Sequence, residues 1–300
     1  MKILVTGATG FIGSALCQYL QAAGHQVHGL IRSKSSLSIP TIQIDDLNQI
    51  ANKHLKGMDA VVHTAGLAHL SNVDPAQYQV VNVDASVKLL QTCIAVGVPR
   101  MITLSSTKAV GEGSVGPRTK INPVTPYGKS KREAERKLEE IQSTSSIELL
   151  QLRIPLIIGQ GVKGNFRRLI DVTGKGWPLP MSALSAKRHY LTIGNLLDFI
   201  EHRMVSDALK SDCLFLADEE AVSLGEVLRA LSIAQGANAF NIPMPKWFLN
   251  QGSRLFLSAK NHEQIFQACL VDSSETYKIS NWKQKYTTIE GIYQMFGKSH

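Results

Sequence analysis

The sequence predicts an α/β fold in which a doubly wound parallel sheet is followed by a smaller C-terminal lobe. Short strand-like runs alternate with helical patterns through the first half of the chain, as in βαβ units with right-handed crossovers. Of the 300 residues, 44% are hydrophobic but only 6% are aromatic, which fits an aliphatic α/β core better than a β-sandwich. After Pro155 the alternation fades. We therefore expect one domain over residues 1–155 and a smaller lobe over residues 156–300, with the chain crossing back to the first sheet.

Each element follows from its local pattern. Apolar β-branched runs bounded by turn residues predict strands over residues 2–6, 27–31, 41–44, 60–64, 100–104 and 148–154. Apolar residues at helical spacing predict helices over residues 14–23, 82–96, 126–142, 193–209 and 223–234. In the second half, loops between shorter elements are marked by Gly159, Gly161, Gly164, Gly174 and Gly176.

A glycine-rich turn lies between the first predicted strand and the first predicted helix. It consists of Gly7, Gly10 and Gly13, with Thr9, Phe11 and Ile12 among them. The first glycine permits a tight turn, the second lets the backbone approach a pyrophosphate, and the third allows close helix–strand packing. Glycines also end strands for purely structural reasons, but a nucleotide-binding motif requires this strand–turn–helix setting. We therefore expect a Rossmann-type domain that binds a nucleotide diphosphate at this turn.

The end of the second predicted strand bears on the choice of nucleotide. A carboxylate there accepts the ribose hydroxyls of NAD, whereas a basic residue favours the 2′-phosphate of NADP. The chain has Arg32 and no acid at that point, so we favour NADP; NAD stays open, because Arg32 can instead stack on the adenine. Asp46 and Leu47 follow the third strand, where a carboxylate can hydrogen-bond to the adenine amino group. A helix N-cap explains Asp46 nearly as well.

A reactive pair opens the helix predicted over residues 126–142. Tyr127 and Lys131 are four residues apart and therefore share one helix face. A nearby ammonium favours the phenolate, which makes the tyrosine a usable general acid and base. The hydroxyls of Ser105, Ser106 and Thr107 end the strand before it, at the sheet edge where ligands bind. Tyrosine and lysine at this spacing are common on structural helices; the combination with the glycine turn indicates catalysis.

Composition excludes several other classes of protein. The net charge is +8, but basic residues are scattered, and those between residues 129 and 140 alternate with glutamates, as on a solvated helix face. We expect no nucleic-acid partner. No apolar run is long enough to span a membrane, and the cysteines have no metal-ligand spacing, so we expect a reduced cytoplasmic chain with no metal. The cysteines are Cys17, Cys93, Cys213 and Cys269.

Together these motifs resemble the extended short-chain dehydrogenase/reductase family. The matching elements are Thr6 to Gly13, His63 to Gly66, Asn82, Ser105 to Thr107, and Tyr127 with Lys131. The resemblance implies that Tyr127 is the acid/base, that Lys131 also holds the nicotinamide ribose, and that Thr107 takes the family's catalytic Ser/Thr position beside Ser105 and Ser106. It also implies that the cofactor is lined by His63, Ala65, Gly66, Ser105 and Pro155.

The family resemblance further implies a homodimer through the helices over 82–96 and 126–142. Their apolar residues fit either that interface or the core of the subunit: Leu89, Leu90, Ala134, Leu138 and Ile141.

Within the family, the second half looks like UDP-sugar enzymes. Asn165 matches a residue that contacts the UDP moiety, and Arg188 matches one that grips the diphosphate, a task that suits a guanidinium fork. The structural alternatives are that Asn165 is a helix cap and that Arg188 is a surface charge. Lys108 either touches substrate or is simply exposed.

Three departures from the 4-epimerases bring the chain nearer to reductases. They are Arg32, the segment Lys108 to Gly111, and the segment Arg153 to Leu156. We therefore expect an NAD(P)-dependent reductase of UDP-4-keto-6-deoxy-N-acetylhexosamines (UDP-QuiNAc or UDP-FucNAc type) in surface polysaccharide synthesis. The first alternative is a UDP-glucose or UDP-GlcNAc 4-epimerase with tightly bound NAD. The remote alternative is a non-catalytic NADP-sensing regulator, which typically loses the acid/base pair.

Overall fold

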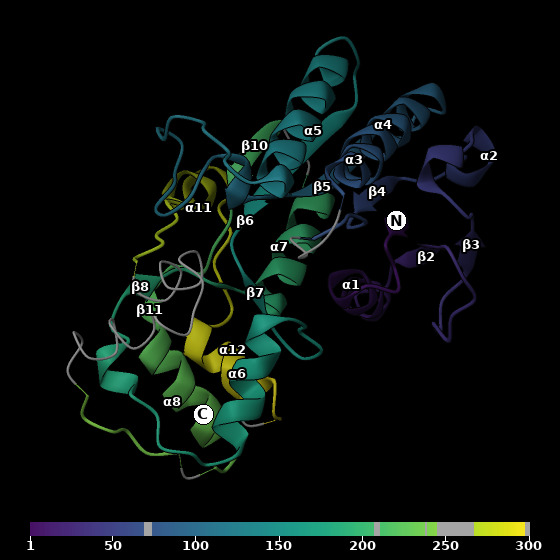
Figure 1. Cartoon of the computed structure of the whole chain (residues 1–300). Helices are drawn as coiled ribbons and strands as arrows, with labels where there is room; N and C mark the ends of the chain where they lie inside the picture. Colours follow the sequence, from purple (N-terminus) through teal and green to yellow (C-terminus); the bar gives the residue numbers. More distant parts are fainter. Residues whose placement is uncertain (69–73, 207–210, 238, 245–266, 298–300) are drawn as a thin grey trace.

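A seven-stranded parallel sheet forms the centre of the molecule (Figure 1). The structure is a computed structural model that describes residues 1–68, 74–206, 211–237, 239–244 and 267–297. The strands run in the order β10-β6-β5-β4-β1-β2-β3. Their bounds are β1 Lys2–Thr6, β2 Gln26–Ile31, β3 Thr41–Gln43, β4 Ala60–His63, β5 Arg100–Ser106, β6 Glu148–Ile154 and β10 Asp212–Phe215. The order reverses beside β1, as in doubly wound folds, so the expected fold class is confirmed.

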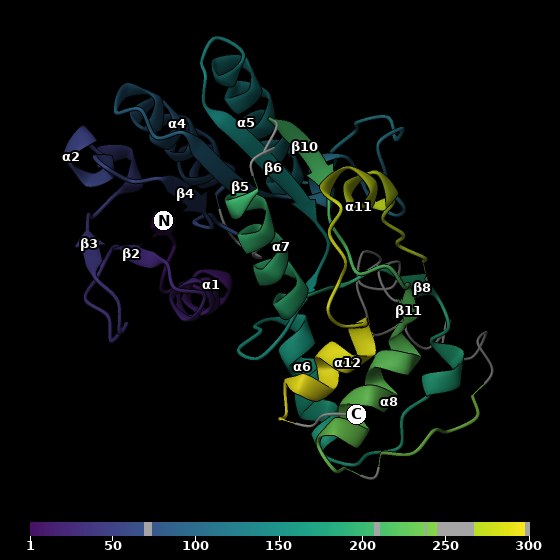
Figure 2. The ribbon, with the colours of Figure 1, turned by 180° about the vertical axis from the view of Figure 1, so that it is seen from behind.

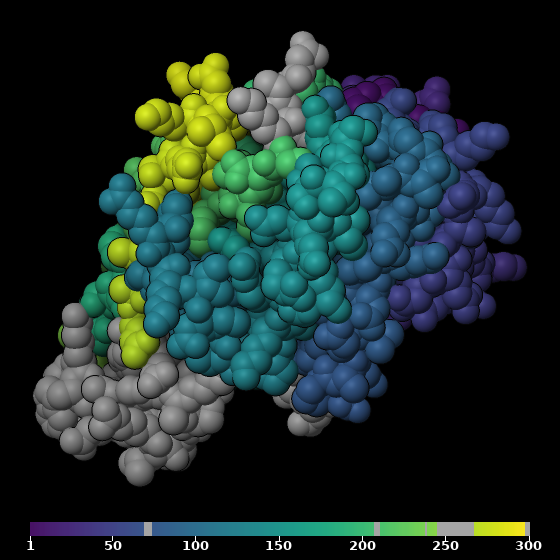
Figure 3. Space-filling model, turned by 90° about the horizontal axis from the view of Figure 1, so that it is seen from above, coloured from purple at the N-terminus to yellow at the C-terminus, as the bar shows by residue number. Residues whose placement is uncertain are grey.

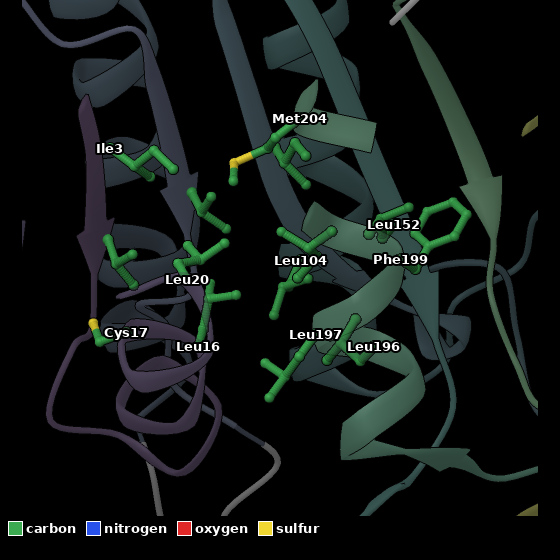
Figure 4. Packing of buried hydrophobic residues seen from close by; sticks show 14 of the residues in the cluster. Ile3, Leu16, Cys17, Leu20, Leu104, Leu152, Leu196, Leu197, Phe199 and Met204 are labelled. Carbon is green, nitrogen blue, oxygen red and sulfur yellow. The ribbon is translucent and has the colours of Figure 1, made fainter. Parts of the chain in front are cut away.

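Helices cover both faces of this sheet. One face is covered by α1 (Phe11–Ala22) and α7 (Ile193–Val205), and Figure 4 shows their side chains meeting those of the sheet. The other face is covered by α2 (Asn52–Leu55), α4 (Ala85–Ala95) and α5 (Pro126–Gln142). Figure 3 shows α5 and α4 side by side at the surface. Alternate strand residues enter the two cores, with Ile3 and Val5 on the α1 side and Leu4 on the α4 side.

The second half of the chain contributes to two regions. It returns to the main sheet with β10, which pairs with β6, and with α7, which covers one face. Its other elements gather below the sheet, as Figures 1 and 2 show from opposite sides. They are β7 Ile157–Ile158, α6 Asn165–Gly174, β8 Lys187–Arg188, β9 Leu191–Thr192, β11 Val222–Ser223, α8 Leu224–Ala234 and α12 Thr288–Gln294. Helix α11 (Ser274–Ser280) instead lies beside β10 at the edge of the main sheet. A separate apolar cluster joins α6, α8 and α12.

Several predicted boundaries move. Helix α1 begins at Phe11 rather than Ser14, because the turn ends at Gly10, which is its N-cap residue. The helix predicted over 82–96 is α4, and it is preceded by a short helix, α3 (Pro75–Tyr78), and a π-helical turn, Gln79–Asp84. The helix predicted over 193–209 ends at Val205, and residues 207–209 lie outside the described part. The helix over 126–142 has the predicted bounds.

The burial of apolar residues on α4 and α5 indicates how these helices pack. Leu89, Leu90 and Leu138 are buried within the subunit, so of the two readings they fit the core. Homodimer formation itself stays a prediction.

Among the described residues, no helix combines the length and the apolar character that crossing a membrane requires.

Candidate active site

The glycine turn is folded tightly against the loop that follows β4. Gly7 has φ of +66°, a conformation that glycine adopts without strain, and its carbonyl accepts a hydrogen bond of 2.8 Å from the Gly10 amide. A Cβ atom on Gly7 would lie 2.8 Å from the Ala65 nitrogen, and one on Gly13 only 2.2 Å from the Gly7 oxygen. Thr9 and Gly10 are exposed at the N-terminus of α1. The turn therefore leaves helix amides available to an anion, as the cofactor prediction requires.

The residues predicted to contact the adenosine half lie on neighbouring strand ends. Arg32 directly follows β2 and is exposed, which suits either contact proposed for it. Asp46 is the N-cap of a 3-10 turn, Leu47–Gln49, and its carboxylate accepts from the Asn48 backbone nitrogen at 2.9 Å. The capping alternative for Asp46 is thus present in the structure. Leu47 packs against the core on the α4 side.

Tyr127 lies in the first turn of α5, where Thr125 caps the helix by accepting from the Gly128 nitrogen at 3.0 Å. Burial raises the pKa of the Tyr127 phenol above its ordinary value, while a hydrogen bond with the Ser106 hydroxyl lowers it. The ring of Tyr78 contacts that of Tyr127, with centroids 6.1 Å apart. The structure therefore pairs the tyrosine with Ser106. Thr107 is the next residue, buried in the first turn of a 3-10 helix.

Lys131 does not act on Tyr127 in the way expected from the sequence. Its Nζ donates to the Leu104 carbonyl at 2.9 Å, and burial lowers the pKa of the ammonium to about 8. The pKa of Tyr127 is raised rather than lowered, because burial of the phenol outweighs the Ser106 hydrogen bond. Gly66 lies close to Asn82, since a Cβ on it would be 3.1 Å from the Asn82 Oδ1, whereas the Lys131 Nζ would be at an ordinary contact distance of 3.5 Å.

His63 is held in a buried chain of hydrogen bonds. Its Nδ1 is 2.7 Å from the Thr6 hydroxyl and its Nε2 is 2.8 Å from the Ser86 hydroxyl. The Ser86 hydroxyl donates to the Asn82 carbonyl at 2.8 Å, so it accepts from His63, which fixes the Nε2–H tautomer. Burial lowers the pKa of His63 to about 3. The ring is 3% exposed, so this side chain supports the site from inside instead of lining it.

Asn82 joins the loop after β4 to the start of α5. Its Oδ1 accepts from the Leu67 nitrogen at 2.8 Å, and its Nδ2 donates to the Leu67 carbonyl and to the Ser130 hydroxyl, both at 3.1 Å. The Ser130 hydroxyl in turn donates to the Tyr127 carbonyl at 2.8 Å. Asn82 lies in the π-helical turn, a feature frequent at functional sites. It thus places the residues Ala65 to Leu67 beside the reactive helix.

Glu135 contradicts the expectation of a solvated face on α5. It is 1% exposed and accepts from the Ser105 hydroxyl at 2.6 Å and from Arg153 Nε and Nη2 at 2.9 and 2.7 Å. The Ser105 hydroxyl is thereby committed to Glu135. The sequence did hold a signal for this pair, because an arginine inside the apolar strand β6 needs a buried acceptor.

The predicted substrate residues lie in the second half of the chain and just after β5. Asn165 is exposed as the first residue of α6, and Arg188 lies in β8 with its Nη2 donating to the Gln267 carbonyl at 3.3 Å. Lys108 is half-buried and forms an ion pair with Glu112, so both alternatives given for it stay open. Pro155 directly follows β6 and is half-buried.

The described residues hold no group of three or more His, Cys, Asp or Glu side chains that suits a metal ion. The polar groups at the carboxyl edge of the sheet are instead a phenol, an ammonium and hydroxyls beside a nucleotide turn. This set is suited to moving a proton on a sugar or alcohol oxygen next to a bound redox cofactor.

Comparison with known proteins agrees with this assignment. Residues 3–208 match the NAD dependent epimerase/dehydratase family. A UDP-glucose 4-epimerase of Vibrio cholerae is 32% identical over 311 residues, which span 98% of this chain and 94% of that protein.

Solved structures share the fold. A Bacillus cereus UDP-glucuronic acid 4-epimerase in complex with NAD has a TM-score of 0.79 at 22% identity, covering 99% of this chain and 95% of its own. A Bacillus cereus UDP-N-acetylglucosamine 4-epimerase has a TM-score of 0.82 at 19% identity, covering 99% and 98%. The family that the chain matches is described as NAD dependent, whereas the sequence pattern favoured NADP because of Arg32. The chain therefore belongs to the NAD dependent epimerase/dehydratase family, within the extended short-chain dehydrogenases/reductases, and is an NAD-dependent enzyme.

Proposed function

We propose that the chain is a 4-epimerase of a UDP-sugar that keeps its NAD through turnover. The observation that carries the proposal is the Tyr127 phenol, hydrogen-bonded to Ser106 and one helical turn from Lys131, at the same sheet edge as the glycine turn. The Vibrio cholerae relative, similar over nearly the whole chain, supports the substrate class and the reaction. This proposal takes the alternative named above in preference to the reductase.

The residues present fit NAD. The turn from Gly7 to Gly13 is a cradle that side chains would fill, because Cβ atoms at both ends would collide with backbone. We assign the diphosphate to this turn and to the first amides of α1, the adenosine to the region of Arg32, and the nicotinamide ribose to Lys131. When bound there, NAD accepts and returns a hydride.

Residues of the chain itself carry out the proton transfer. In its phenolate form, Tyr127 removes the proton from the sugar C4 hydroxyl as a general base, and the resulting phenol later returns the proton to that oxygen as a general acid. Ser106, bonded to the phenol, stabilises its anionic form, because its hydrogen bond lowers the Tyr127 pKa. We propose that Thr107 hydrogen-bonds to the sugar oxygen and that Lys131 supplies the positive charge of the site.

The UDP half of the substrate is assigned to Asn165 and Arg188. Asn165 begins α6 after Gly164, which has φ of +70°, so its backbone nitrogen and its side chain are both near a helix N-terminus. Arg188 supplies a guanidinium fork that can hold a diphosphate bidentately. Lys108 is not assigned to substrate, because Glu112 already pairs with it.

A reductase of a UDP-4-keto-6-deoxy-N-acetylhexosamine, with a role in surface polysaccharide synthesis, remains the second candidate. It is favoured by Arg32, an exposed cation at the end of β2 where NAD enzymes usually have an acid. The same phenol would then only donate its proton.

The subunit arrangement and location are further proposals. We propose a cytoplasmic homodimer. The cytoplasmic location is supported by the four cysteines, all of which are free thiols, as expected in a reducing compartment. The dimer interface would use the outer faces of α4 and α5, because their buried leucines belong to the core.

One experiment separates the two candidates. The purified protein is incubated with UDP-glucose, UDP-GlcNAc and an enzymatically generated 4-keto sugar, while bound nucleotide and reduced-cofactor absorbance are measured. The proposal requires retained NAD and C4 epimerisation with no added cofactor, and Tyr127→Phe should abolish it. Stoichiometric NADPH consumption with the keto sugar alone would establish the reductase, and undiminished turnover by Tyr127→Phe would exclude both.

A further inference from the structure

A buried carboxylate lies directly behind the reactive pair. Glu135 is on α5, one turn after Lys131 and two turns after Tyr127, so the three residues share one face of the helix. We propose that Glu135 is a positioning residue, which fixes the end of β5 against α5 so that this strand holds both Tyr127 and Lys131. The catalytic part of this inference rests on the proposed function.

Three consecutive residues of β5 each bind one residue of this helix face. The Leu104 carbonyl accepts from the Lys131 Nζ at 2.9 Å, and the Ser106 hydroxyl hydrogen-bonds to the Tyr127 phenol. Between them, the Ser105 hydroxyl donates to Glu135 Oε1 at 2.6 Å. Ser105 stands between Leu104 and Ser106 in the chain. A shift of Ser105 therefore moves the Leu104 contact with Lys131 and the Ser106 contact with Tyr127.

The contact between Ser105 and Glu135 is strong because the carboxylate is fully buried and charged. Arg153 on β6 lies opposite Ser105 in the strand register and donates to both carboxylate oxygens, at 2.9 and 2.7 Å. Arg132 adds a hydrogen bond of 3.1 Å from the solvent side. Hydrogen bonds to an ionised, desolvated acceptor are among the strongest in proteins. One side chain thus ties α5 to two adjacent strands at the edge where the chemistry takes place.

Glu135 also sets the charge around Lys131. Burial lowers the pKa of Lys131 to about 8, and the negative charge of Glu135 opposes that shift. Glu135 is the charged group among the described residues that acts on this ammonium, since His63 on β4, which also interacts with Lys131, is neutral because burial lowers its pKa to about 3. Loss of the Glu135 charge therefore leaves Lys131 protonated over a narrower pH range.

Two variants test the proposal, with a third as control. Ser105→Ala removes only the hydroxyl that joins β5 to Glu135. Glu135→Gln removes the charge with little change of shape. Glu140→Gln makes the same charge change on α5 at an exposed ion pair with Arg136. Thermal unfolding and circular dichroism identify variants that fold.

Turnover provides the first readout. We expect Ser105→Ala to lower kcat for the UDP-sugar by tenfold or more with KM within about twofold, and Ser105→Thr to restore most of it, since a role only in folding would not change kcat of the folded enzyme. Glu140→Gln should leave both constants unchanged. A folded Ser105→Ala variant with the kcat of the wild type would overturn the proposal.

The second readout needs no substrate. The carbon-13 shift of the Lys131 ε-carbon, assigned with Lys131→Arg, is followed against pH by NMR. Glu135→Gln should lower the Lys131 pKa by half a unit or more, and Glu140→Gln should not change it. An unchanged Lys131 titration in folded Glu135→Gln overturns the electrostatic part. If the wild type converts no UDP-sugar, the proposed function fails, and this titration alone decides whether Glu135 acts on Lys131.

Discussion

The glycine turn makes a quantitative prediction for Gly13→Ala. The new Cβ would lie 2.2 Å from the Gly7 oxygen and 2.7 Å from the Gly7 carbonyl carbon. Ordinary contacts at such a pair exceed about 3.4 Å, so the turn must shift by roughly 1 Å. That carbonyl also accepts the Gly10 amide at 2.8 Å, so the displacement reaches the part of the turn assigned to the diphosphate. Overpacking of this kind costs about 1–3 kcal/mol.

Two measurements follow from this shift. Thermal unfolding should show a fall of roughly 2–12 °C in Tm, taking about 2–4 °C per kcal/mol for a chain of this size. A misplacement of about 1 Å should also weaken NAD binding, measured by calorimetry, by up to about 100-fold.

A graded series supplies the controls. A Cβ on Gly10 would lie 3.1 Å from the Gly7 oxygen, and one on Gly111 would lie 3.7 Å from the Asn122 oxygen, an ordinary contact. The effects should therefore fall in the order Gly13→Ala, Gly10→Ala, Gly111→Ala. Wild-type NAD affinity and thermal stability in Gly13→Ala would refute the reasoning.

Three further predictions concern other groups. Burial raises the pKa of Asp218 to about 6 from 3.8, so the folded chain binds this proton more tightly than the unfolded chain. Up to about 3 kcal/mol of stability is present below about pH 4 and lost as the pH rises through about 6, and Asp218→Asn should flatten this dependence in denaturant unfolding. Asn82→Ala leaves a loop and a helix without their shared partner, at a cost of about 1–3 kcal/mol, and should lower kcat more than it raises KM. Lys108→Ala breaks only a surface pair with Glu112, so stability should change by less than about 1 kcal/mol, and a tenfold rise in KM would show that Lys108 touches substrate.

Features set by local sequence could be predicted. The glycine turn depends on residues within one strand–turn–helix, and the spacing of Tyr127 and Lys131 is fixed once their helix is recognised. The helix itself was predictable because Thr125 and Pro126 are strong start signals, and the structure has the predicted bounds. The parallel, doubly wound character of the sheet follows from the regular alternation of strands and helices and from crossover handedness.

Features that depend on distant partners could not be predicted in the same way. Glu135 was placed on a solvated face because its neighbours on α5 are charged, yet Ser105 and Arg153 on adjacent strands make it buried. His63 was expected to line the cofactor, but Thr6 and Ser86 bind both ring nitrogens inside the sheet. In each case a buried polar residue pairs with residues on other strands or helices. The spacing of residues along the sequence does not show which distant residues come into contact.

The choice between epimerase and reductase also depends on a contact between distant segments. The ring of Phe11, at the start of α1, packs against both the core on the α1 side of the sheet and the cluster around α6, and it lies beside Gly159 and Gly161. The turn assigned to the cofactor and the loop leading to the proposed UDP site are thus held together by one ring. An opening that separated them would expose Phe11, at a cost of about 1.5–3 kcal/mol. An epimerase keeps its cofactor and needs no such opening, whereas a reductase exchanges its cofactor in every cycle. The contact therefore favours the epimerase, even though Arg32 alone favours the reductase.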